Sequence, residues 1–166
     1  EMEEMIDGYL AFAAGEGDET PQDLAVDDLL NRLVTQAHKS HKFDITLSPV
    51  KDDIPAFPMR RNAIQRAFSN IISNAIRYST KTIVAIRIRN DEVIITFDDN
   101  GAGIPQERRA DAIRPFIRLE ESRNRRTGGA GLGLSITSDV ILSHGGELTL
   151  GDSSLGGLRV TLKLPV

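Results

Sequence analysis

The sequence predicts an α/β fold, a two-layer sandwich in which a mixed sheet carries helices on one face. Three segments have the apolar spacing of amphipathic helices, and they alternate along the chain with short runs rich in β-branched residues. Such alternation is typical of an α/β domain. A chain of 166 residues, 40% of them hydrophobic, can bury roughly 70% of the surface that it exposes when unfolded. We therefore expect one main domain.

The first half of the chain predicts two helices and two extended pieces. Apolar residues at i, i+3, i+4 and i+7 predict a helix over about 26–40; they are Val26, Leu29, Leu30, Leu33, Val34 and Ala37. A strand is predicted at 44–47, and Pro55 and Pro58 bracket a short extended piece. A long helix is predicted over about 59–78, with an apolar stripe of Ile64, Ala67, Phe68, Ile71, Ile72 and Ala75.

The second half predicts four strands and one helix. Two β-rich runs, 82–88 and 93–97, flank a short polar segment and predict a hairpin. Residues 101–129 are polar and poor in strand signals. A helix over about 132–143 ends before Gly145-Gly146, and closing strands at 147–150 and 158–164 are joined by a glycine-rich turn.

Composition excludes several classes of protein. The net charge is −4, from 20 Lys and Arg against 24 Asp and Glu, which excludes a strongly basic nucleic-acid binder. No apolar run approaches the ~18 residues of a membrane span. The absence of Cys excludes disulfides, thiolate metal sites and a cysteine nucleophile.

The amino-terminal part differs from the rest, because residues 1–31 contain ten acidic residues and no Lys or Arg. Residues 1–13 have helical spacing but are too short to fold alone, so we interpret them as the end of a helix from a preceding segment. A surface helix of the same domain is the alternative. Residues 14–23 are predicted to be a linker, and residues 24–166 the domain itself.

Three polar motifs are candidates for chemistry. Asn70, Asn74 and Arg77 lie together beside the apolar stripe of the long helix; an amide oxygen can bind Mg²⁺, and Arg can bind phosphate. Asp99 ends an apolar strand before a glycine turn, where a carboxylate can accept a hydrogen bond from a base. Residues 128–135 form a glycine-rich turn leading into a helix, whose amino terminus can hold phosphate. Each motif alone also fits an ordinary surface role.

Together the motifs resemble, in order and spacing, the ATP-binding domain of sensor histidine kinases, in the superfamily of gyrase, Hsp90, histidine kinase and MutL (GHKL). Residues 68–79 resemble its N box, 99–103 its G1 box, 113–116 its F box and 129–134 its G2 box. Gly156-Gly157 resembles the closing glycine turn. The resemblance covers residues 24–166, and residues 3–13 resemble the end of the dimerisation hairpin of EnvZ-like kinases.

This resemblance implies the Bergerat ATP-binding fold with a mobile lid at 105–130, and ATP and Mg²⁺ as cofactors. It implies that Asp99 binds the adenine amino group and that Asn74 binds Mg²⁺, with Asn70 assisting. The implied phosphoryl-transfer residues are Asn70, Arg77 and Arg118. The implied nucleotide contacts are Asn70, Asn74, Arg77, Tyr78, Asp99, Gly101, Gly103, Ile104, Phe116, Gly129, Gly131, Leu132, Gly133 and Leu134.

The implied function is the catalytic half of a two-component sensor kinase. ATP would phosphorylate a histidine on a dimerisation hairpin, for relay to a response-regulator aspartate. His38, His41 and His144 lack the family's acceptor pattern and are predicted to be surface or capping residues, so the acceptor is expected outside this chain. The implied whole protein is a homodimer anchored in the inner membrane, with this domain in the cytoplasm and no nucleic-acid partner.

Two alternatives remain within the same superfamily. One is a serine kinase of the anti-sigma-factor type, from which the EnvZ-like amino-terminal helix distinguishes this chain. The other is a water-using ATPase, whose members place a Glu general base where this helix has Asn70. A non-catalytic nucleotide sensor is disfavoured because Asn74, Asp99 and the glycines are all present.

Overall fold

The computed structural model describes residues 19–115 and 132–166. The elements, in chain order, are β1 (Gln22–Leu24), α2 (Val26–His41), β2 (Asp44–Leu47), β3 (Phe57–Met59), α3 (Arg61–Tyr78), β4 (Lys81–Arg89), β5 (Glu92–Asp99), η1 (Gln106–Arg108), α4 (Arg109–Ala112), α5 (Gly133–Ser143), β6 (Glu147–Asp152) and β7 (Leu158–Pro165). No helix within these two ranges is long and apolar enough to cross a membrane.

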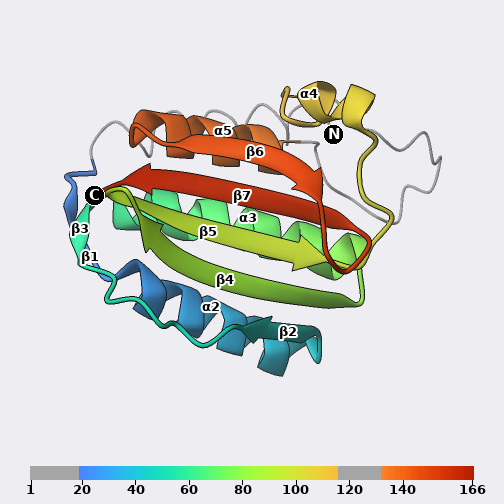
Figure 1. Ribbon diagram of the computed structural model, residues 1–166, viewed down its shortest axis with the longest axis horizontal. Coiled ribbons are helices and arrows are strands. Elements are labelled where there is room, and N and C mark those ends of the chain that lie inside the picture. The colour runs from blue at the N-terminus through green and yellow to red at the C-terminus, as the bar shows by residue number, and fades with distance from the viewer. Residues whose placement is uncertain (1–18, 116–131) are drawn as a thin grey trace.

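The main sheet is mixed, and its helices lie on one side, which confirms the predicted fold class. Its strand order is β2-β4-β5-β7-β6; β2 is parallel to β4, and the other neighbours are antiparallel. Helices α2, α3 and α5 cover one face (Figure 1). The sheet's side chains alternate between that face and the opposite, partly exposed one, as the period of a strand requires.

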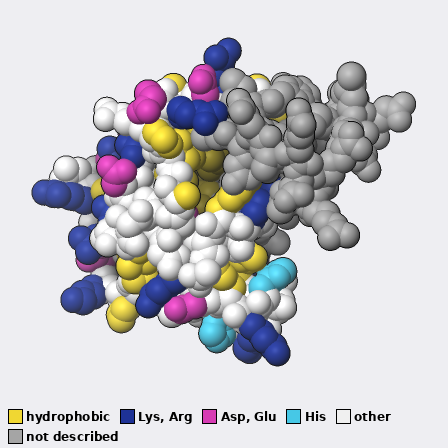
Figure 2. All heavy atoms as spheres, turned by 90° about the vertical axis from the view of Figure 1, so that its right-hand side faces the viewer, with side chains coloured by type: hydrophobic (Ala, Val, Ile, Leu, Met, Phe, Trp, Pro, Cys, Tyr) yellow, Lys and Arg dark blue, Asp and Glu magenta, His cyan; other side chains and the backbone are white. Residues whose placement is uncertain are grey.

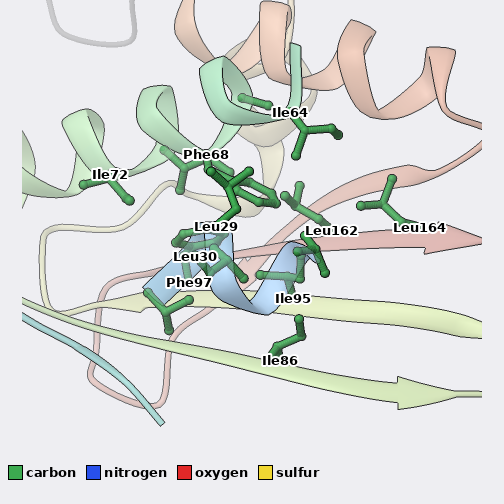
Figure 3. Close-up of a cluster of buried hydrophobic side chains, with 14 of the residues drawn as sticks. Leu29, Leu30, Ile64, Phe68, Ile72, Ile86, Ile95, Phe97, Leu162 and Leu164 are labelled. Atoms are coloured by element: carbon green, nitrogen blue, oxygen red, sulfur yellow. The ribbon is translucent and has the colours of Figure 1, made fainter. Parts of the chain in front are cut away.

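The hydrophobic core lies between the sheet and the three helices. All six apolar residues of the predicted α3 stripe are buried. Phe68 of α3 packs against Phe97 of β5, with ring centroids 6.2 Å apart. Figure 3 shows the buried side chains around this pair, which also come from α2, β4 and β7. The predicted stripe of α2 is also confirmed; within it only Leu33 is half-buried, and it packs against the core.

The β4–β5 hairpin is tight and sets the register of the central strands. Its two turn residues, Asn90 and Asp91, have φ of 52° and 60°, the left-handed values that a type I′ turn requires. Asn and Asp tolerate this region better than other non-glycine residues. The resulting register places Asp99 opposite Thr82 at the far end of the hairpin.

Helix α3 begins later than the sequence predicts. The helix was expected from about residue 59, but Met59 ends β3 and pairs with Gln22 of β1 in a small second sheet that was not predicted. The helix begins at Arg61. Its first turn is capped from a distance: the carboxylate of Glu19 accepts the backbone N–H groups of Asn62 at 2.7 Å and Ala63 at 3.2 Å. A local pattern cannot reveal such a cap.

The segment after β5 contains more regular structure than its polar sequence suggests. Residues 106–112 form η1 and the short helix α4, and Ile113 packs against the core. These residues are the start of the lid that the resemblance implies. The remainder of that predicted lid, residues 116–130, lies outside the described residues.

Candidate functional site

The three motifs meet at one end of the molecule. At this end β5 finishes, β4 and β7 begin, α3 finishes and α5 begins, on the right-hand side of Figure 1. Figure 2 faces that end, where backbone and uncharged polar side chains occupy much of the centre and hydrophobic, basic and a few acidic side chains lie around them. The fold therefore gathers residues that are far apart in the sequence.

Asp99 is held by one of its two carboxylate oxygens. Oδ1 accepts the backbone N–H of Gly101 at 2.8 Å and that of Leu158, the first residue of β7, at 3.0 Å. Among the described residues, no group donates a hydrogen bond to Oδ2, and the side chain is half-buried. A buried or half-buried carboxylate oxygen fixed in place in this way can accept a hydrogen bond from a ligand.

Glycines allow the backbone to close tightly around this carboxylate. A Cβ on Gly157 would lie 2.2 Å from Asp99 Oδ1, and a Cβ on Gly101 would lie 2.4 Å from the carbonyl oxygen of Tyr78. Gly103 has φ +69°, which disfavours any side chain. The loop 100–104 thus packs against both the end of α3 and the turn before β7.

Asn70 and Asn74 face the first turn of α5. The amide nitrogen of Asn70 donates to the carbonyl oxygen of Gly133 at 3.4 Å. A Cβ on Gly133 would lie 3.6 Å from Asn74 Nδ2 and 3.8 Å from Asn74 Oδ1. Thr137, which is fully buried, reinforces this contact. Its hydroxyl lies 3.3 Å from the carbonyl oxygen of Ala67 in α3 and 2.8 Å from that of Gly133 in α5.

The amino terminus of α5 opens toward the same end of the sheet. Leu132 is buried, while Gly133 and Leu134 are half-buried, and no acidic residue lies in the first turn. The partial positive charge of this terminus is therefore not neutralised by its own helix, and it favours an anion. The site combines this positive end with the two amide side chains of α3.

Arg77 and Tyr78 lie exposed in the last turn of α3, with the Arg77 guanidinium carbon 5.8 Å from the centroid of the Tyr78 ring. Both are at the site's end of the helix. Four predicted site residues, Phe116, Arg118, Gly129 and Gly131, lie outside the described residues.

Sequence reasoning missed several residues that build the site. Leu158 contributes a backbone N–H to Asp99 from 59 positions away, and Arg109 joins two loops by its guanidinium. Asn100 accepts the N–H groups of Thr80 at 3.0 Å and Lys81 at 2.9 Å, which fixes the turn from α3 into β4. The one available signal was the position of Asn100 inside an acidic glycine turn, where its side chain can bond the backbone.

The three histidines lie at two helix ends, His144 after α5 and His38 and His41 in the last turn of α2. His144 Nε2 accepts the backbone N–H of Arg60 at 3.1 Å, so its Nδ1 carries the proton and donates to the Val140 carbonyl at 2.7 Å. It follows the end of the 11-residue helix α5, roughly 16 Å from the first turn of that helix. His38 and His41 are exposed at the end of α2.

The donor set can hold a magnesium ion together with a polyphosphate. Mg²⁺ prefers oxygen ligands and commonly takes one or two from the protein and the rest from phosphates and water. The Asn74 amide oxygen lies beside an anion-favouring helix terminus, which fits that arrangement. No group of three Asp, Glu, His or Cys side chains suited to a metal occurs within residues 19–115 and 132–166.

Comparison with known proteins gives consistent matches. Residues 59–166 match the family described as histidine kinase-, DNA gyrase B- and HSP90-like ATPase. The sensor histidine kinase CpxA of Escherichia coli is 45% identical over 106 residues, which are 63% of this chain and 23% of CpxA. The sensor protein RstB of the same species is 31% identical over 172 residues, covering 100% of this chain and 39% of RstB. The chain thus spans well under half the length of these relatives.

Solved structures share the fold. The ATP-binding domain of PrrB from Mycobacterium tuberculosis superimposes with a TM-score of 0.70 at 28% identity, covering 89% of this chain and 98% of that one. Full-length ShkA in complex with AMPPNP gives a TM-score of 0.79 at 19% identity, covering 98% of this chain and 35% of ShkA. The second likeness concerns the fold alone.

Proposed function

The chain belongs to the histidine kinase-, DNA gyrase B- and HSP90-like ATPase family, and from that premise we propose that it is the ATP-binding catalytic domain of a two-component sensor histidine kinase. It binds ATP with Mg²⁺ and presents the γ-phosphoryl group to a histidine on a dimerisation hairpin. A response-regulator aspartate then receives the phosphoryl group. The whole protein is a homodimer in the inner membrane, with this domain in the cytoplasm.

One observation carries the proposal: Asp99 is fixed through Oδ1 by two backbone N–H groups, while no donor among the described residues uses Oδ2, which can accept a hydrogen bond from a ligand. The 6-amino group of adenine can donate a hydrogen bond to this oxygen, and the glycines let the backbone pack closely enough to hold Asp99 in place. A guanine ring would place a carbonyl oxygen against the carboxylate, so the site favours ATP over GTP.

The phosphates lie toward α3 and α5 in this proposal. Asn74 supplies an oxygen to Mg²⁺, Asn70 supports it, and Arg77 offers positive charge at the edge. Gly133 and the first turn of α5 contribute the helix terminus. These groups neutralise and orient the triphosphate, which is the main contribution of proteins to phosphoryl transfer.

Hydrolysis by water is disfavoured, since α3 contains no Asp or Glu that could act as a general base. The chain should therefore bind ATP and release phosphate very slowly. Calorimetric titration with ATP and Mg²⁺ tests binding, and a phosphate-release assay tests hydrolysis. Absence of ATP binding, or steady turnover at ~1 per second or faster, would refute the proposal.

The acceptor distinguishes a histidine kinase from a serine kinase of the anti-sigma-factor type. Incubating the full-length protein with γ-labelled ATP should yield a phosphorylated product that is labile in acid and stable in alkali, as phosphohistidine is. A product with the opposite stability would indicate a phosphoserine and would favour the serine-kinase alternative.

A further inference from the structure

Arg109, the first residue of α4, connects two loops of the site. Its Nε–H donates to the carbonyl oxygen of Ile104 at 3.0 Å, and its Nη2–H donates to Asp152 Oδ1 at 2.6 Å. The side chain is only 18% exposed, whereas Asp152 is 90% exposed. The adjacent Arg108 is exposed. Of these two adjacent arginines, Arg109 is therefore the one whose side chain is largely buried.

Both of these loops contact Asp99. Ile104 follows the glycine loop 100–103, and Asp152 ends β6, just before the turn 153–157 that returns to Asp99. That turn is fixed by the Gly157 N–H, which donates to the Asp99 carbonyl at 3.1 Å, and by the Ser153 N–H, which donates to the Gly157 carbonyl at 2.9 Å. Gly103 approaches the same turn, since a Cβ there would lie 3.3 Å from the Gly157 carbonyl oxygen.

We propose that Arg109 is a positioning residue for the adenine moiety: its guanidinium sets the spacing between the glycine loop and the β6–β7 turn, and thereby the place of the Asp99 carboxylate. The inference rests on the proposed nucleotide site and goes beyond it, because it gives a role to Arg109, which is not among the residues proposed to contact the nucleotide. A planar guanidinium suits this role, since its donors hold two acceptors at a fixed angle.

The contact is more than a surface ion pair. An exposed pair alone adds little, and Asp152 is almost fully exposed. The bond to the Ile104 carbonyl is different, since it is made by a largely buried group and ties α4 to the end of the glycine loop. Loss of Arg109 would leave that carbonyl without its donor and would free the loop from α4.

The test compares ATP with purine riboside triphosphate, which lacks the 6-amino group. Dissociation constants are measured for the wild-type chain and for Arg109→Ala, Arg109→Lys and Asp152→Ala, in Mg²⁺. We expect Arg109→Ala to weaken ATP about tenfold and the analogue much less, so that the preference for ATP shrinks. Asp152→Ala and Arg109→Lys should have smaller effects in the same direction. Arg108→Ala, the matched control, should change neither constant.

The outcomes separate this inference from the proposed function. If the wild-type chain binds no ATP, the nucleotide site itself is refuted. If it binds ATP and folded Arg109→Ala keeps the wild-type ratio of the two constants, Arg109 is merely structural and the inference is overturned. If Arg109→Ala does not fold, Arg109→Lys decides, because a single ammonium group cannot hold both acceptors at the fixed angle of a guanidinium: an unchanged ratio overturns the inference, and a reduced one supports it.

Discussion

Asp98 and Arg159 lie opposite each other on β5 and β7 and form a two-point ion pair, with Nε to Oδ1 at 2.7 Å and Nη2 to Oδ2 at 2.9 Å. Asp98 is 6% exposed. The next residue on β5 is Asp99, and the residue before Arg159 is Leu158, whose N–H holds Asp99. The ion pair therefore fixes the strand register at the point where Asp99 is positioned.

Replacing Arg159 by Ala should destabilise the fold by about 1–3 kcal/mol, because a buried carboxylate loses its partner. The hydrogen bond to Asp98 raises the pKa of the Arg159 guanidinium above its ordinary value. A raised pKa in the folded state means that this stabilisation is fully present below the unfolded pKa and is lost only as pH rises through the folded pKa. The loss measured by urea unfolding should therefore be equal at neutral and moderately alkaline pH.

Lys163→Ala is the control for Arg159, since its ion pair with Glu147 is exposed on both sides. It should cost less than about 0.5 kcal/mol. A cost for Arg159→Ala no larger than this would show that the ion pair with the buried Asp98 does not secure the register.

Asp99→Asn should weaken ATP binding at least tenfold and leave the fold intact. The Asn Oδ1 can still accept the N–H groups of Gly101 and Leu158. The amide NH₂ then stands where Oδ2 was, and it presents a donor to the donor of adenine. Losing a charge-assisted hydrogen bond costs about 1.5–3 kcal/mol. Calorimetry gives the affinity and thermal unfolding the stability, with exposed Asp139→Asn as control; unchanged affinity would exclude Asp99 as the adenine ligand.

Asn74→Ala should weaken chiefly the part of ATP affinity that depends on Mg²⁺. The reason is that it removes the amide oxygen beside the first turn of α5 and leaves the Asp99 loop unchanged. The measurement is ATP affinity with Mg²⁺ and with a chelator, in parallel with exposed Ser73→Ala on the same helix. Equal losses in both conditions would contradict a metal role for Asn74.

Much of this arrangement can be predicted from local patterns. The α3 stripe is readable because burial repeats with the helical period, and Asn74 and Asp99 were identified from their positions on a helix edge and at a strand end. The residues that were missed act over long distances. Glu19 caps α3 from 43 positions away, and Asp152 meets Arg109 across 43 positions. Which distant side chain fills a cap or bridges two loops depends on the packed fold, and no local period encodes it.

The Glu19 cap makes a separate prediction about stability. Glu19→Ala removes the acceptor of two N–H groups in the first turn of α3, which has no acidic residue of its own there. We expect a loss of about 1 kcal/mol in the free energy of unfolding. Asp23→Ala removes an equal charge from an exposed position nearby and should cost less. An equal loss in the free energy of unfolding for both variants would mean that the change in net charge, and not the loss of the cap, causes the destabilisation.

Gly157→Ala should abolish or strongly weaken nucleotide binding through steric conflict alone. A Cβ at this position would lie 2.2 Å from Asp99 Oδ1, 2.4 Å from the Gly101 nitrogen and 2.6 Å from the Asp99 carbonyl oxygen. None of these three atoms can easily move aside to make room for the methyl group, because two belong to the backbone and Oδ1 is held by two hydrogen bonds. The turn must move away, and the Leu158 N–H must leave the carboxylate.

Gly151→Ala provides a matched control for this change, since nothing lies within 4 Å of a Cβ there. Both variants add one methyl group to the same β6–β7 hairpin, so they differ only in what that methyl meets. ATP affinity should fall at least tenfold for Gly157→Ala, about the cost of losing the Asp99 contact, and remain unchanged for Gly151→Ala. If Gly157→Ala binds ATP normally, Asp99 does not need the Leu158 N–H to hold the base, and the carboxylate must be positioned by the Gly101 N–H alone.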